Sequence, residues 1–283
     1  MLLKPLIKTH QITAFFLLTF IISWLSWGAV ALLFGKVEIA SYPLFILGTF
    51  GPSIAGFGLT GLLEGRAGMG RLLRRMFQWR AGITWYVAAM FTIPAIMIAA
   101  LAISVLLGNS PGTTPFLQWW LPLALPFVLV IGVLTGGPLE EEPGWRGYAL
   151  PRLQALWNPL IGTLVLGAIW SCWHLPLFFI PGTSQYGLPF IFFALHTICL
   201  ALFMTWIYNR TGGSLLFAML FHASTNISFA VLPLIAPGGS PMAAYLYFAL
   251  ECLVVVAIVG LNWKDFTTRK PLLEAPVKAS SSA

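Results

Sequence analysis

The stretch "ITAFFLLTFIISWLSWGAVALL", residues 12–33, decides the fold class of this chain. It contains no Asp, Glu, Lys or Arg, and it reaches the length of about 20 apolar residues that a helix needs to cross a bilayer. The run is too long for the apolar part of a signal peptide and lacks a clear small-residue cleavage site. We therefore expect it to stay in the protein as a membrane span.

Apolar runs of this kind recur along the whole chain. Of its 283 residues, 59% are hydrophobic, and the mean hydropathy is +0.89. Lipid cannot satisfy backbone polar groups, so such runs form helices or closed barrels, and continuous rather than alternating runs favour helices. The sequence predicts an all-α, polytopic bundle of about eight transmembrane helices in the cytoplasmic (plasma) membrane. The expected spans are residues 12–34, 43–63, 82–107, 118–137, 159–181, 188–208, 213–235 and 242–263.

The formal net charge of +7 is explained by topology. With this set of spans, nearly all Lys and Arg fall on one side of the membrane, and only Lys36 lies in a connection on the other side. The positive-inside rule then makes both termini cytoplasmic. No basic patch is interleaved with aromatic residues, so we expect no nucleic-acid partner.

The domain organisation is expected to be simple. We find no internal repeat, and we predict one integral-membrane helical domain over residues 1–270, with its functional core at about 43–235. The tail, residues 271–283, ends in "VKASSSA" and is expected to be disordered and cytoplasmic.

The densest charge of the chain lies in "GGPLEEEPGWRGYALPRLQ", residues 136–154, although only 8% of all residues are charged. Glu142 and Arg146 are four residues apart and share a helical face, so Arg146 can neutralise Glu142. The adjacent Glu141 is turned by about 100° around such a helix and points elsewhere. One carboxylate is then structural, and the other is free to react.

The other polar side chains in apolar segments come from different helices. His174 lies in the fifth expected span, and His222 and Asn226, four residues apart, share a face of the seventh. Carboxylate, imidazole and amide are the groups that activate a water molecule and stabilise an oxyanion. Their combination predicts hydrolysis inside the bilayer.

Each of these residues also has a structural interpretation. A Glu cluster beside an Arg at a membrane interface is about as often a solvated helix end, since interfacial charge is inexpensive. A lone intramembrane His is more often a hydrogen-bonded packing residue, which is our interpretation of His196. Glu251 has no evident partner in the sequence.

Three motifs in this order give the chain a family resemblance. "EEPGWR" (141–146) resembles EExxxR, "WSCWH" (170–174) resembles FxxxH with Trp in place of Phe, and "HASTN" (222–226) resembles HxxxN. Together they are similar to the motifs of the CPBP family of intramembrane proteases. This family includes the type II CAAX prenyl endopeptidases and the bacteriocin-processing or immunity proteins.

The resemblance implies a role for each motif residue. Glu141 and His174 are expected to activate the attacking water, with Glu142 and Arg146 in support. His222 and Asn226 are expected either to bind a metal or to hold the oxyanion. If zinc is bound, the expected ligands are Glu141, His174 and His222, and without a metal Glu141 is itself the general base.

The resemblance also implies a substrate, which is a membrane-bound or lipidated protein or peptide cleaved near its C-terminal or juxtamembrane part. Other protease classes lack their motifs here, because the chain has no HExxH and Asp265 is its only aspartate. The alternative functions are a non-catalytic membrane immunity or scaffold protein, or a proton-coupled transporter that uses Glu251 and His196.

Straight helices raise a geometric problem for this site. At about 1.5 Å per residue, Glu141 would lie near the cytoplasmic surface and His174 well towards the opposite side. Either residues 136–138 turn the chain back into the protein, or the fifth helix begins deeper than expected. Irregular backbone is tolerated at membrane depth where it lines a cavity.

Overall fold

A computed structural model of the protein describes residues 3–114, 119–234 and 239–272. Within these ranges the regular structure is entirely helical, which confirms the predicted all-α class. The expected disordered tail, residues 271–283, lies outside the described residues from 273 onwards. The helices are α1 (Leu3–Thr9), α2 (Gln11–Leu33), α3 (Tyr42–Thr49), α4 (Gly51–Met76), α5 (Ile83–Leu106), α6 (Leu121–Thr135), α7 (Pro138–Gly144), the π-helix η1 (Trp145–Ala149), α8 (Leu150–Leu156), α9 (Pro159–Trp173), the 3₁₀ helix η2 (Leu175–Phe179), α10 (Phe190–Arg210), α11 (Leu215–Val231), α12 (Met242–Leu261) and α13 (Trp263–Thr267).

Several of these helices have the length and composition of membrane spans. Five described segments qualify singly, namely α2, α5, α9 with η2, α10 and α12. Two bent pairs, α3 with α4 and α6 with α7 to α8, raise the number to 7 if each pair is one span. The shorter α11 is also apolar and fills the place of the seventh expected span. The count of eight and the orientation stay predictions.

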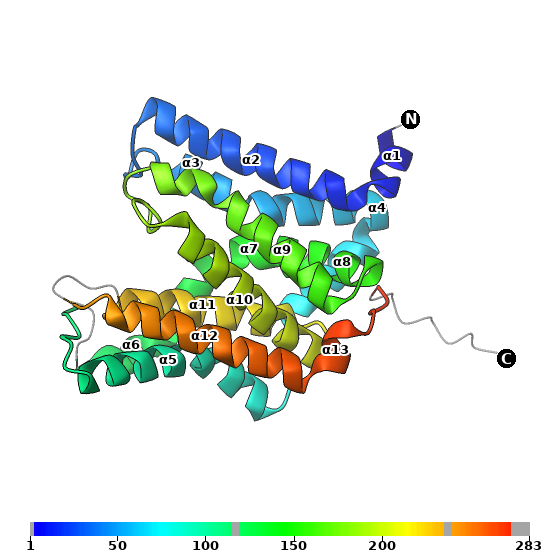
Figure 1. Ribbon diagram of the computed structural model, residues 1–283. Helices are drawn as coiled ribbons and strands as arrows, with labels where there is room; N and C mark the ends of the chain where they lie inside the picture. Colours follow the sequence, from blue (N-terminus) through cyan, green and yellow to red (C-terminus); the bar gives the residue numbers. More distant parts are fainter. Residues whose placement is uncertain (1–2, 115–118, 235–238, 273–283) are drawn as a thin grey trace.

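The helices pack as a bundle in which α9 and α10 lie in the middle (Figure 1). On one side α2 packs against α3 and α4, and on the other side α5 packs against α11 and α12. The short helices α1, α8 and α13 lie at one end of the bundle, on the right in Figure 1. The chain thus enters and leaves the bundle at the same end.

The segment from Pro138 to Leu156 differs most from the sequence expectation. It was expected to begin at a cytoplasmic helix end, but it is folded into the bundle, and α7 packs against α4 and α11. The chain bends by 52° between α6 and α7, and Gly137 adopts a φ of +104°, a conformation that favours glycine. The placement of Glu141 at the surface is therefore wrong, because the turn at residues 136–138 carries it into the interior.

Close backbone approach holds this buried segment against α4. A Cβ on Gly144 would lie 2.2 Å from the backbone oxygen of Pro52, so only glycine fits there. The Ser53 hydroxyl donates a hydrogen bond of 3.0 Å to the carbonyl oxygen of Leu139. These contacts fix how deeply the charged residues of α7 lie within the helix bundle.

The common end of α1 and α13 predicts that both termini lie on the same side of the membrane. Green fluorescent protein, which fluoresces after folding in the cytoplasm, should fluoresce when it is fused to either end of the chain. Alkaline phosphatase, which is active only outside the cytoplasm, should be inactive at both ends. Opposite results at the two ends would require an odd number of spans and contradict the arrangement.

Candidate functional site

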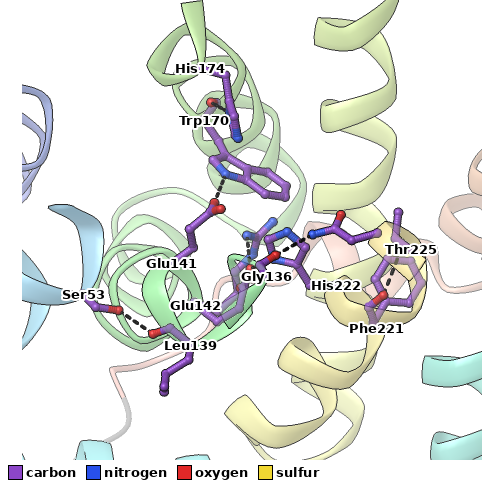
Figure 2. Close-up of polar contacts among 12 residues, drawn as sticks. Ser53, Gly136, Leu139, Glu141, Glu142, Trp170, His174, Phe221, His222 and Thr225 are labelled. Atoms are coloured by element: carbon purple, nitrogen blue, oxygen red, sulfur yellow. Dashed lines mark hydrogen bonds and ion pairs between the residues drawn. The ribbon is translucent and has the colours of Figure 1, made fainter. Parts of the chain in front are cut away.

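Glu141 is buried between α7 and α9. Its side chain is 5% exposed, and its Oε2 accepts a hydrogen bond of 2.6 Å from the indole Nε1 of Trp170 (Figure 2). Trp170 lies on α9, one helical turn before His174. The first carboxylate of the predicted catalytic set is therefore held by a side chain from the second motif.

Glu142 forms the predicted pair with Arg146. Both side chains are 0% exposed, and Arg146 Nη1 donates to Glu142 Oε1 over 3.1 Å. The same oxygen lies 2.7 Å from His222 Nδ1, so Glu142 also binds α11. Glu142 thus joins the first and third motifs, as a structural carboxylate should.

His174 follows the last residue of α9. Its Nδ1 lies 2.9 Å from the carbonyl oxygen of Trp170, so this nitrogen donates and Nε2 is left for another partner. The imidazole packs edge-on against Trp173 and Phe193, with ring centroids 4.6 and 5.0 Å away. Its tautomer and its orientation are both fixed by these contacts.

His222 and Asn226 face the break between α6 and α7, as their shared helical face predicts. The Asn226 amide donates to the carbonyl oxygen of Gly136 over 2.8 Å. A Cβ on Gly137 would lie 3.7 Å from His222 Nε2 and 3.0 Å from Glu141 Oε1. The second oxygen of Glu141 and the outer nitrogen of His222 therefore both lie beside Gly137, on the side where another residue would carry its Cβ.

The predicted zinc ligands gain no support from this arrangement. Within the described part of the chain, no group of three or more His, Cys, Asp or Glu side chains is placed to hold a metal ion. Glu141 Oε2 is engaged by Trp170, and Glu141 and His174 are bound to opposite ends of that residue. The assignment of Glu141, His174 and His222 as a ligand set therefore gains no support.

A second polar cluster lies between α10 and α12. His196 Nδ1 is 2.8 Å from Glu251 Oε1, and the Tyr247 hydroxyl donates to the same oxygen over 3.0 Å. Glu251, which has no evident partner in the sequence, thus has two in the structure. The hydrogen bonds join α10 to α12, and the interpretation of His196 as a packing residue stays a prediction.

Trp170 is the contact residue that the sequence analysis missed. The signal was present, because the second motif carries Trp where the family pattern has Phe, and only Trp adds an N–H donor. The guanidinium of Arg146 lies 4.1 Å from the centre of the Trp170 ring, in a cation–π contact. Trp170 thus contacts Glu141 and Arg146 of the first motif and His222 of the third motif. It also contacts His174 of its own motif.

Comparisons with known proteins identify relatives of this chain. Residues 118–228, which include all three motifs, match the family model described as type II CAAX prenyl endopeptidase Rce1-like. The chain is also 26% identical over 230 residues to the CAAX prenyl protease 2 of Methanococcus maripaludis, across 77% of this chain and 83% of that protein. The family resemblance is confirmed, and with its apolar spans the chain is an integral membrane protein.

Breaking the buried ion pair should destabilise the protein strongly. We expect Arg146→Ala to lower the free energy of unfolding by about 3–5 kcal/mol, because it leaves the Glu142 carboxylate buried without its cation. The matched control is Arg71→Ala, which removes a half-exposed partner of Glu64 and should cost less than about 1 kcal/mol. Thermal unfolding in detergent measures the stability of both variants. Equal losses of stability would contradict the assignment of Glu142 and Arg146 as a stabilising buried ion pair.

Proposed function

We propose that the protein is a membrane-embedded endopeptidase in which Glu141 activates the attacking water. The observation that carries the proposal is that Glu141 Oε1 and His222 Nε2 lie beside the same residue, Gly137, within a buried polar cluster. A catalytic site needs a position close to both a base and an oxyanion stabiliser, and the place beside Gly137 is close to both. The match to the type II CAAX prenyl endopeptidases supports the same reaction class.

The proposed reaction begins with proton transfer from water to Glu141 Oε1. The hydroxide that forms attacks the carbonyl carbon of the scissile peptide bond and gives a tetrahedral oxyanion. Protonated His222 donates from Nε2 to this oxyanion, and the second amide N–H of Asn226 is available beside it. The proton held by Glu141 then passes to the leaving amine as the peptide bond breaks.

His174 completes the proposed catalytic group. Its Nδ1 is satisfied by the Trp170 carbonyl, so Nε2 is the nitrogen that can bind the water or the substrate. We propose that it shares in activating the water, as the family resemblance implies. The zinc alternative stays a prediction, and no step of this scheme requires a metal.

The proposed substrate is a membrane-associated protein cleaved near its C-terminus. The relative in M. maripaludis is named as a CAAX prenyl protease, which favours a lipidated, CAAX-like end over a soluble peptide. An apolar anchor would concentrate such a substrate in the bilayer that holds the site. The match to CAAX prenyl proteases favours the protease over the transporter alternative, which would use the hydrogen-bonded pair of Glu251 and His196.

Replacing the proposed base should abolish cleavage. We expect Glu141→Gln to reduce kcat at least about 1,000-fold, because the amide cannot take a proton from water. The matched control is Glu140→Gln, a buried neighbour outside the proposed machinery, which should keep most of the activity. The assay follows a prenylated peptide with a CAAX-like end in vesicles by mass spectrometry. Full activity of Glu141→Gln would remove this carboxylate from the mechanism.

Metal removal should leave the enzyme active. We expect cleavage to continue after dialysis against EDTA and in the presence of 1,10-phenanthroline, because no three metal-ligating side chains come together among the described residues. Metal analysis of the purified protein accompanies the assay. Loss of activity that zinc restores and magnesium does not would support the zinc prediction instead.

A further inference from the structure

The indole N–H of Trp170 distinguishes the two oxygens of Glu141. Oε2 accepts the hydrogen bond of 2.6 Å from Trp170, whereas Oε1 lies beside Gly137, 3.0 Å from where a Cβ of that residue would be. A carboxylate oxygen that accepts a short bond from a fixed donor is held in position and is a weaker proton acceptor. Only Oε1 is then both free and directed towards the proposed water.

Trp170 is itself held rigidly. It is 2% exposed, and its own carbonyl oxygen accepts from His174 Nδ1. The guanidinium of Arg146 lies over its ring, and the edge of His222 meets it with ring centroids 5.5 Å apart. A donor fixed on several sides has a fixed N–H direction, which is what preorganisation of a neighbouring group requires.

Simple packing does not account for this N–H. The buried indole nitrogens of Trp145, Trp173 and Trp206 have no hydrogen-bond partner among the described residues. The fold therefore tolerates buried indole donors without acceptors, yet the donor of Trp170 is aimed at the proposed base. Trp also replaces the Phe of the family pattern at this position, so the donor is a feature of this chain.

We propose that Trp170 is a positioning residue that holds Glu141 by Oε2 and thereby makes Oε1 the oxygen that takes the proton from water. In this proposal the water lies beside Gly137, where any side chain would crowd Glu141 Oε1. This inference rests on the proposed function and adds to it an atomic assignment of the base.

Trp170→Phe tests the donor directly, because it keeps an aromatic ring and restores the residue of the family pattern. We expect kcat to fall about 10- to 100-fold, as for the loss of one hydrogen bond to a charged group, with KM within about 2-fold. Trp206→Phe is the matched control, since it removes an indole N–H that has no partner in the described chain and lies outside the site. It should leave kcat unchanged. Wild-type kcat in Trp170→Phe, with loss only in Trp170→Leu, would reduce the role to packing and overturn the inference.

Gly137→Ala tests the place assigned to the water. The added methyl group would lie 3.0 Å from Glu141 Oε1, at a φ of +104°. Gly187→Ala is the matched control, because Gly187 also has a positive φ, of +75°, but no atom lies within 4 Å of its added Cβ. Both variants carry backbone strain, and we expect only Gly137→Ala to lose at least about 10-fold in kcat beyond any loss of stability. If the two variants have equal kcat, the assignment of the water to the place beside Gly137 is wrong.

The variants distinguish a failure of the positioning inference from a failure of the proposed function. If Glu141→Gln is inactive while Trp170→Phe and Gly137→Ala cleave like the wild type, the positioning inference is wrong and the proposed function stands. If Glu141→Gln cleaves like the wild type, the proposed function and the inference are wrong together.

Discussion

The buried carboxylate of Glu142 is the constraint on which the site depends. Moving a charge from water into an apolar bundle costs several kcal/mol. A buried charge is therefore stable only where it has close partners. Arg146 and His222 both reach the same oxygen of Glu142, one from the next turn of its own segment and one from α11. The segment after the break is thereby fixed to α11, and this attachment keeps Glu141 and His222 on the same side of Gly137.

Irregular backbone at the break is stabilised by the same neighbours. The turn at Gly136 and Gly137 frees carbonyl groups that a continuous helix would satisfy, and lipid offers them no partner. Asn226 donates to the oxygen of Gly136, and Ser53 donates to that of Leu139. The Asn of the third motif therefore has a structural contact in addition to its proposed place beside the oxyanion, and a single side chain connects the backbone turn with the chemistry.

The sequence predicted the helices well and the buried turn poorly, for a physical reason. Spans such as α2, α5, α10 and α12 follow from apolar length alone, which is a local property. The charge of residues 136–154 pointed to a surface, because its partners are remote. Trp170, for example, is 29 residues from Glu141, and Glu142 is 80 residues from His222. Motif spacing indicated that these residues belong together, but only the packing of α7 against α4 and α11 shows how the chain brings them there.

Two adjacent glutamates can serve different purposes because the helix turns them apart. Arg146 and His222 both bind one oxygen of Glu142 directly, whereas the direct hydrogen bond of Glu141 comes from a neutral donor, the Trp170 indole. A carboxylate paired with a cation is a poor base, since the cation stabilises its charged form. The neutral indole of Trp170 orients Glu141 without adding a positive charge beside it. Phe would leave the carboxylate without an orienting donor, and a positively charged side chain would make it a weaker base. A neutral N–H donor therefore orients the general base and preserves its basicity.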